Sequence, residues 1–263
     1  MPLIDPILLK ARLAEMAGRF DVDALDGCDS TSSELLRRAD AGAPAGTVVV
    51  ADRQEAGRGR RGRGWLSTPE RSLTFSVLWR FAAPPARLGG LSLAVGLAVA
   101  AALEALGGRG VGLKWPNDVL LTTASGQAKL AGVLVEVAGD RRASLAVIGI
   151  GLNLAAPLGE TTLPAAGLDQ AGLSAIDRHD LLAALLRELA ATLDRFAAAG
   201  FAALRPDWQR RHVWRDRPVQ VLGEGEAPLA GLCLGVDDDG ALLLGTEAGP
   251  RRIHSGDVSL RPA

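Results

Sequence analysis

The chain is poor in cysteine and carries almost no net charge. Its two cysteines, Cys28 and Cys233, lie far apart in 263 residues and form no CxxC pair. This pattern excludes a disulfide framework and suits a reducing cytoplasm. The 29 Lys+Arg residues against 30 Asp+Glu give a formal net charge of −1. A protein that coats nucleic acid usually carries excess positive charge over a whole face, so the composition argues against that class.

No hydrophobic run is long enough to span a membrane. The most apolar stretch, residues 88–103, has 16 residues without a charge, short of the roughly 20 that a bilayer requires. Its richness in alanine and glycine favours a buried helix. The first twenty residues carry Asp5 and Lys10 within their apolar part, so they lack the core of a signal peptide. We expect a soluble cytoplasmic protein without a membrane partner.

Several signatures of catalysis are also missing. The three histidines, His179, His212 and His254, have no metal-ligand spacing. The sequence has no G-x-S-x-G nucleophile elbow and no G-x-x-x-x-G-K-[ST] phosphate loop. The chain therefore gives no indication of a zinc site or of a covalent intermediate on one of its own nucleophiles.

The sequence does contain the periodic patterns of a large core. Hydrophobic residues make up 48% of the chain, enough for one large domain or for a large and a small one. Apolar runs predict strands over 47–52, 72–80, 111–121 (interrupted by Pro116), 129–139 and 143–154. Periodicity and capping residues predict helices over 3–18, within 28–42, over 91–106 and over 177–196.

The composition changes towards the C-terminus. Residues 205–219 are polar and charged, and short β runs separated by glycine and aspartate follow them. Short strands at roughly ten-residue spacing predict a small β-barrel. We therefore divide the chain into a domain of residues 1–213 and a domain of residues 214–263.

One short segment concentrates positive charge. In "GRGRRGRG", residues 57–64, four arginines alternate with glycines, and Trp65 follows. Four glycines make a helix or strand entropically costly, so we expect a loop that is mobile when empty. Arginine forks suit carboxylate and phosphate oxygens, so the loop could order around an anion and close over it. The alternatives are a solvated basic loop and an RNA-binding segment.

Three further patterns are weak one by one. In "KWPND", Pro116 ends strand pairing and turns Asn117 and Asp118 off the strand end. Asparagine can read a purine edge, and aspartate can help to hold Mg²⁺. Lys129 lies at the start of a strand, and the glycines of "GIGLN", residues 149–153, permit close backbone approach before Asn153.

Taken in order, these segments resemble one family. The motifs "DST", "QEAGRGRRGRGW", "KWPND", "KLAGVLVE" and "GIGLN" are similar to the motif series of the biotin protein ligases, and "SGDVSLRP" resembles the end of their C-terminal domain. The resemblance implies an α+β (α/β) fold, with a mixed sheet backed by helices as in class II synthetases, then an SH3-like barrel. It implies activation of biotin with ATP and Mg²⁺ to biotinyl-5′-AMP. Biotin then passes to a lysine of the biotin carboxyl carrier protein of acetyl-CoA carboxylase.

The resemblance also assigns residues. Lys129, Arg58 and Arg60 would be catalytic. The biotin site would comprise Ser30, Thr31, Ser32, Gln54, Arg58, Gly59, Arg60 and Lys129. The ATP site would comprise Arg60, Arg61, Trp65, Asn117, Asp118 and Asn153, with Mg²⁺ on Asp118. Two positions depart from the family pattern: Ser32 stands where asparagine is usual, and Asp257 where glutamate is common.

The resemblance leaves rival interpretations open. Some family members carry an N-terminal DNA-binding domain, but only about 28 residues precede "DST" here, and a helix-turn-helix domain needs roughly twice that. We expect a monofunctional ligase without DNA binding, forming a homodimer as many members do. A lipoate ligase or octanoyltransferase shares the fold, although the Gly-Arg motif argues against it. A nucleic-acid-binding module that uses the arginine run is the rival of another class.

Overall fold

The computed structural model describes residues 2–158, 164–223, 227–256 and 258–262. The strands are β1 (Asp21–Cys28), β2 (Thr47–Gln54), β3 (Ser72–Phe81), β4 (Val111–Lys114), β5 (Asp118–Thr123), β6 (Gly126–Gly139), β7 (Ser144–Asn153), β8 (Pro218–Gly223), β9 (Leu229–Val236), β10 (Leu242–Thr246), β11 (Gly249–Ile253) and β12 (Val258–Pro262). The helices are α1 (Pro6–Leu13), α2 (Thr31–Asp40), α3 (Leu91–Ala105), α4 (Arg178–Ala199) and α5 (Arg205–Arg211), with short 3-10 turns η1 (Ala14–Arg19), η2 (Arg60–Gly62), η3 (Pro85–Arg87), η4 (Leu168–Ala171) and η5 (Phe201–Ala203).

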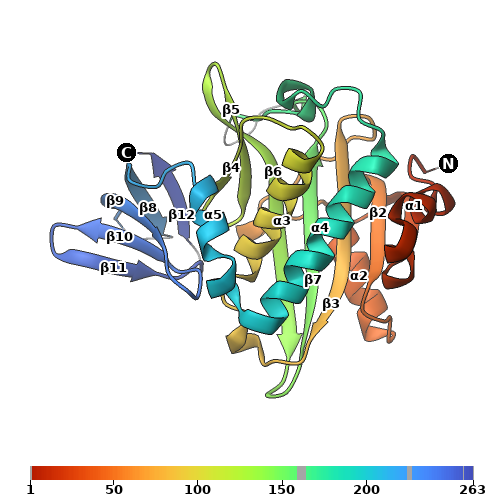
Figure 1. The fold of residues 1–263 in the computed structure, drawn as a ribbon, viewed down its shortest axis with the longest axis horizontal. Helices are drawn as coiled ribbons and strands as arrows, with labels where there is room; N and C mark the ends of the chain where they lie inside the picture. Colours follow the sequence, from red (N-terminus) through yellow and green to blue (C-terminus); the bar gives the residue numbers. More distant parts are fainter. Residues whose placement is uncertain (1, 159–163, 224–226, 257, 263) are drawn as a thin grey trace.

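A seven-stranded mixed sheet forms the larger part of the molecule. Its strand order is β1-β2-β3-β7-β6-β5-β4; β1 and β2 are parallel, and the other neighbours are antiparallel. Alternate side chains of each strand point to opposite faces. Val48 and Val50 belong to the main core, under α3 and α4, whereas Val49 belongs to a smaller core under α2. Figure 1 shows α3 and α4 lying side by side across one face of the sheet.

The C-terminal strands form a second sheet at one end of the first (Figure 1). They are antiparallel in the order β11-β10-β9-β8-β12. The expected barrel is therefore only partly right: β11 and β12 are opposite edges, and within the described residues no ladder joins them. The buried Trp115 fastens the two sheets, because its Nε1 donates to the Gly240 carbonyl oxygen at 3.0 Å.

Most predicted elements are confirmed, with instructive differences. The predicted strand 111–121 is a hairpin of β4 and β5 around Pro116. The charged segment at the domain boundary contains helix α5. Strand β1, which precedes α2, was not predicted. Ser30 occupies the N-cap position of α2, but its side chain makes no capping hydrogen bond. The Ser/Thr cluster instead turns partly towards the sheet, as described below. Both cysteines are free, and Cys233 is buried in the core.

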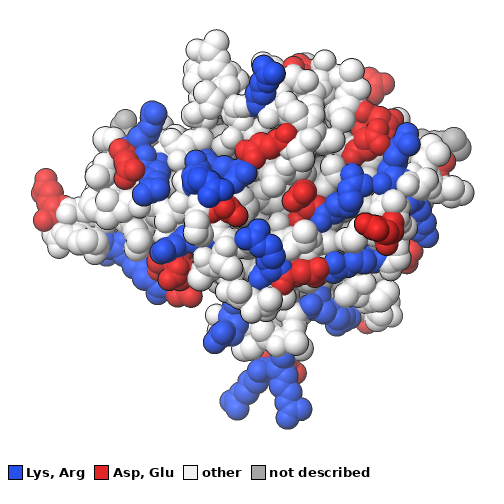
Figure 2. Space-filling model, in the orientation of Figure 1, with Lys and Arg blue, Asp and Glu red and all other residues white. Residues whose placement is uncertain are grey.

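The surface that carries α3, α4 and α5 mixes charges of both signs. Figure 2 shows blue and red groups interspersed over this face, without a broad area of one sign. Ion pairs such as Arg211–Glu104, at 2.6 Å, account for part of this pattern. A face of this kind lacks the continuous positive potential that nucleic-acid coating requires. Among the helices that the structure describes, none is long and apolar enough to cross a membrane.

Candidate active site

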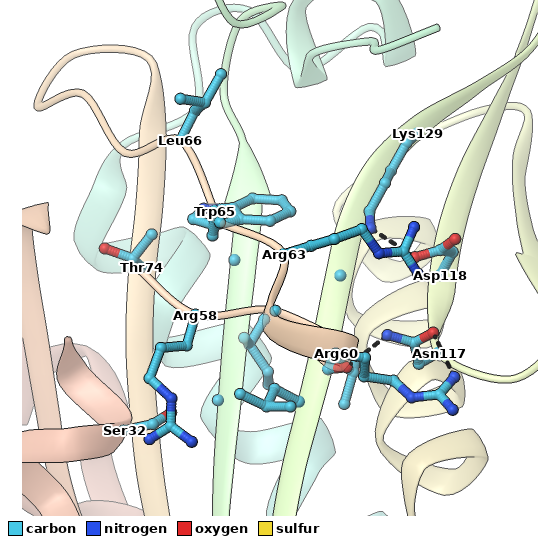
Figure 3. Close-up of a pocket in the computed structure, with 18 of the residues that line it drawn as sticks. Ser32, Arg58, Arg60, Arg63, Trp65, Leu66, Thr74, Asn117, Asp118 and Lys129 are labelled. Atoms are coloured by element: carbon cyan, nitrogen blue, oxygen red, sulfur yellow. Dashed lines mark hydrogen bonds and ion pairs between the residues drawn. The ribbon is translucent and has the colours of Figure 1, made fainter. Parts of the chain in front are cut away.

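One cavity gathers nearly all the predicted site residues. It has a volume of about 210 Å³ and lies over β6 and β7, between the start of α2, the Gly-Arg loop and the β4–β5 hairpin. Val258, Ser259 and Leu260 of β12 complete its wall, so the C-terminal sheet reaches the site. Figure 3 shows the loop passing over the cavity, with Trp65 and Arg63 on its inner side.

Hydroxyl and amide groups form one end of the cavity. The Thr31 N–H and the Thr31 hydroxyl both donate to Gln54 Oε1, at 2.8 and 3.1 Å. Thr31 Oγ1 lies 2.8 Å from Ser76 Oγ, which lies 3.0 Å from Ser32 Oγ. Since a backbone N–H can only donate, the amide oxygen of Gln54 must face Thr31. Because the Thr31 hydroxyl donates its proton to Gln54, Ser76 must donate to Thr31, and Ser32 must donate to Ser76. In this hydroxyl relay, Ser32 Oγ is left to accept a hydrogen bond from a further donor.

A cluster of two lysines and one carboxylate forms the other end. Lys129 Nζ lies 2.6 Å from Asp118 Oδ1, and Lys114 Nζ lies 2.9 Å from Asp118 Oδ2. Burial raises the pKa of Asp118, but attraction to Lys129 and Lys114 outweighs burial and holds that pKa well below its usual value. Burial lowers the pKa of Lys114 more than Asp118 raises it. The cluster carries a net positive charge beside the cavity.

The Gly-Arg loop closes on itself above this cluster. The Arg58 and Gly64 backbones form an isolated bridge, and η2 turns the chain between them. Arg58 is paired with Glu136 at 2.5 Å and lies towards Ser33, at 3.2 Å. Arg60 donates to Asn117 Oδ1 at 3.3 Å and to the carbonyl oxygens of residues 255 and 256. The loop therefore bridges β6, the β4–β5 hairpin and the C-terminal sheet.

Glycines in the sheet make room for what lies above them. A Cβ on Gly151 would lie 2.2 Å from the Trp65 indole, and one on Gly149 would lie 2.5 Å from Ser32 Oγ. Both distances are below any real contact, so the glycines of "GIGLN" permit close approach, as the sequence predicts. Trp65 also lies beside Lys129, whose Nζ is 5.6 Å from the ring centroid. Trp65 Nε1 is buried and has no hydrogen-bond partner among the described residues.

Known proteins share both parts of this chain. Residues 28–153 match the model of the biotin/lipoate A/B protein ligase family, and residues 216–261 match that of the biotin protein ligase C-terminal domain. The bifunctional ligase/repressor BirA of Escherichia coli (strain K12) is 38% identical over 269 residues, which cover 99% of this chain and 81% of that protein. The biotin–[acetyl-CoA-carboxylase] ligase of Mycobacterium tuberculosis is 37% identical over 98% of this chain and 95% of its own length. This chain belongs to the biotin protein ligase family.

The structure leads to the same family. The fold of this ligase matches a biotin protein ligase from Aquifex aeolicus, solved in complex with biotin and ATP, with a TM-score of 0.76 and 32% identity. The match covers 92% of this chain and 99% of that one. The mixed sheet backed by helices and the additional C-terminal sheet are therefore the fold of this family, as the sequence motifs imply.

Of the predicted site residues, all but Arg61 line the cavity of the ligase. Those that do are Ser30, Thr31, Ser32, Gln54, Arg58, Gly59, Arg60, Trp65, Asn117, Asp118, Lys129 and Asn153. Arg61 has a left-handed backbone, φ 60°, and lines a second, outer hollow with residues 255 and 256. Asn153 donates from Nδ2 to the carbonyls of Lys129 and Ala166, at 3.2 and 3.1 Å. Individual roles in binding stay predictions, and Asp257 lies outside the described residues.

The surroundings of Asp118 do not form a ready metal site. Each of its oxygens already accepts from an ammonium group, as described above. Among the described residues, no group of three His, Cys, Asp or Glu side chains could hold an ion. The residues present therefore do not fit a protein-held Mg²⁺ at this position, and the assignment of Mg²⁺ to Asp118 stays a prediction that the geometry does not favour.

Sequence reasoning missed several residues of the site, among them Arg63, Ser76, Glu136 and Lys114. Arg63 lines the cavity where Arg61 was expected. The pKa of Arg261 is lowered first by its own burial and second by the nearby charge of Arg63. Ser76 carries the hydroxyl relay, and Glu136 pairs with Arg58. For Ser76 no local signal exists, since its partners are distant in sequence; Glu136 ends the motif "KLAGVLVE", but its pairing with Arg58 depends on the fold. Lys114 did have a signal, because it opens "KWPND" four residues before Asp118.

Proposed function

We propose that this ligase activates biotin with ATP to biotinyl-5′-AMP and then transfers biotin to one lysine of a biotin carboxyl carrier protein. The observation that carries the proposal is the two-ended cavity, with a hydroxyl relay at one end and a cationic cluster at the other, beneath the Gly-Arg loop. The names of its relatives support the same reaction, since one is a biotin–[acetyl-CoA-carboxylase] ligase and another holds biotin and ATP.

The hydroxyl relay suits the ureido ring of biotin. That ring offers two N–H donors and one carbonyl acceptor. Ser32 Oγ stands at the donor end of the relay and is left to accept an N–H. Serine in place of the usual asparagine therefore keeps an acceptor at this position. A ring without N–H groups would leave Ser32 Oγ without a donor, which costs about 1–3 kcal/mol.

The cationic end suits the bond-forming step. A carboxylate oxygen of biotin must approach the α-phosphorus of ATP, and pyrophosphate leaves as the phosphoanhydride bond breaks. Two anions repel each other, so the enzyme must supply fixed positive charge. Lys129, Arg60 and Arg63 lie at this end of the cavity, whereas Arg58 lines it nearer to the start of α2. In the second step the lysine amine of the carrier attacks the biotinyl carbonyl, and AMP leaves.

The loop explains how the intermediate survives. Biotinyl-5′-AMP is a mixed anhydride, which water hydrolyses, so the site must exclude water. The loop spans the cavity from β2 to β3 and, through Arg60, meets residues 255 and 256, which lie between β11 and β12. We propose that it opens to admit substrates and closes over the adenylate.

Assembly and placement are further parts of the proposal. We infer a homodimer, because β1 forms the outer edge of the large sheet and pairs only with β2 among the described strands. We also propose a cytoplasmic location, because the two free cysteines suit a reducing compartment. Residues 1–213 and 214–263 are proposed as two domains that share the site. Sedimentation velocity with and without biotin and ATP tests the dimer, and a single monomeric boundary at all concentrations contradicts it.

Biotin-dependent exchange of labelled pyrophosphate into ATP tests the reaction. We expect exchange that requires biotin, with lipoate in place of biotin as the matched control for the related ligases. Exchange with lipoate but not with biotin would assign the chain to the lipoate branch. Absence of exchange in folded protein with either acid would overturn the adenylation proposal altogether.

A further inference from the structure

The chain uses lysine sparingly, and two of its lysines meet at one carboxylate. Only three of the 29 Lys+Arg residues are lysines: Lys10, Lys114 and Lys129. Lys10 is exposed on α1. Lys114 and Lys129 hold the two oxygens of Asp118, at 2.9 and 2.6 Å. In a chain that otherwise relies on arginine, this pairing marks a place where a compact ammonium is required.

Burial orders these three groups in depth. The side chain of Lys114 is 4% exposed, that of Asp118 is 8% exposed and that of Lys129 is 27% exposed. All three residues line the cavity, with Lys114 the most deeply buried, Asp118 next and Lys129 the most exposed. Figure 3 shows Lys129 reaching towards Asp118 alongside Arg63.

The three strands at this edge of the sheet fix the order. Lys114 ends β4 and faces Asp118, which begins β5, directly across the hairpin. A register shift in the β5–β6 ladder, between Val119 and Leu120, precedes the pairing of Leu120 with Lys129. Behind Lys114 lies the ring of Trp214, whose centroid is 5.4 Å from Lys114 Nζ. Trp214 belongs to the segment that leads into the C-terminal sheet, so the cluster is backed by the junction of the two sheets.

We propose that Lys114 is a positioning residue, which fixes the position of the Lys129 ammonium by orienting the Asp118 carboxylate between them. An ammonium on Oδ2 holds the carboxylate in one orientation, which leaves Oδ1 directed at Lys129. It also supplies the charge that allows a buried carboxylate to remain ionised next to a cavity meant for anions. Without Lys114, Asp118 can turn and draw Lys129 back from the cavity. The inference rests on the proposed function, in which Lys129 contacts the reacting anions.

A double-mutant cycle tests whether Lys114 acts through Lys129. Lys114→Met is measured alone and in a Lys129→Ala background, by biotin-dependent pyrophosphate exchange at high enzyme concentration. We expect the single variant to lower kcat by roughly 5- to 100-fold while the KM for biotin changes little. In the Lys129→Ala background we expect the same change to alter kcat by less than about twofold, because the residue that it positions is absent.

A purely structural role predicts a different result. A lysine that only supports the fold would cost the same factor in both backgrounds, and that outcome overturns the proposal, as does a single variant with wild-type kcat. Lys10→Met, which removes the exposed lysine, is the matched control. Thermal unfolding is followed for each variant, and Lys114→Gln replaces Lys114→Met in the cycle if the latter does not fold. Exchange by the wild-type chain tests the proposed function separately. The cycle tests only the role of Lys114, because each variant is compared with the protein that differs from it at position 114 alone.

Discussion

Replacement of Lys129 by alanine tests the cationic end of the site directly. Its ammonium, 2.6 Å from Asp118 and beside the cavity, offsets a buried carboxylate and leaves positive charge for an anion. At an effective dielectric constant of about 20, a unit charge about 4 Å from an anionic oxygen contributes about 4 kcal/mol. Loss of one preorganised group of this kind costs roughly 2–4 kcal/mol of transition-state stabilisation. We therefore expect adenylate formation to slow by roughly 30- to 1,000-fold.

The assay is biotin-dependent pyrophosphate exchange, with Lys10→Ala as control. Both variants remove one lysine, but Lys10 is exposed on α1, away from the cavity. Circular dichroism and thermal unfolding verify that Lys129→Ala is folded. Exchange within about threefold of the wild type in a folded Lys129→Ala protein would refute the assignment of Lys129 to the reacting centre.

Three further predictions follow from particular contacts. Gly151→Ala places a Cβ within 2.2 Å of Trp65 and should displace the indole, changing tryptophan fluorescence and slowing exchange; the open site of Gly18 gives Gly18→Ala as control, and equal behaviour of the two variants contradicts the contact. Arg60→Gly removes the link to residues 255 and 256 and should release biotinyl-5′-AMP that labels unrelated proteins, and a streptavidin blot with label confined to the carrier would argue against retention by the loop. Burial lowers the pKa of His212 to about 3, so the unfolded chain binds a proton near pH 6.5 that the folded chain refuses, and stability should fall by about 2 kcal/mol from pH 7.5 to 5; urea unfolding should show a smaller loss in His212→Gln, and equal losses would contradict this.

The binding groups could be predicted because the motifs are contiguous. The arginines and glycines of the loop, Trp65 and Lys129 each lie in a short segment whose pattern resembles one family, and all of these segments meet at one cavity. Strand and helix positions were predictable for a similar reason, because periodicity and end signals act over a few residues. The edge strand β1 escaped prediction, since its aspartates interrupt the apolar pattern.

The orientation of neighbouring side chains was not predictable. Within the loop, Arg63 faces the cavity and Arg61 does not, because the η2 turn gives Arg61 a left-handed backbone. The sequence shows four arginines of equal character, and only the turn distinguishes them. In the same way, "KWPND" predicts a turn, but only the ladder between β4 and β5 sets Lys114 opposite Asp118.

The sequence by itself determined the family, the element types and the segments that form the site, because these depend on composition and on interactions over a few residues. Only the tertiary structure decided which side chains from distant segments contact each other. Ser32 meets Ser76, 44 residues away, and Arg58 meets Glu136, 78 residues away. The C-terminal strands stay an open sheet because β11 and β12 end at opposite edges. Such contacts depend on how the whole chain packs, and no local pattern encodes them.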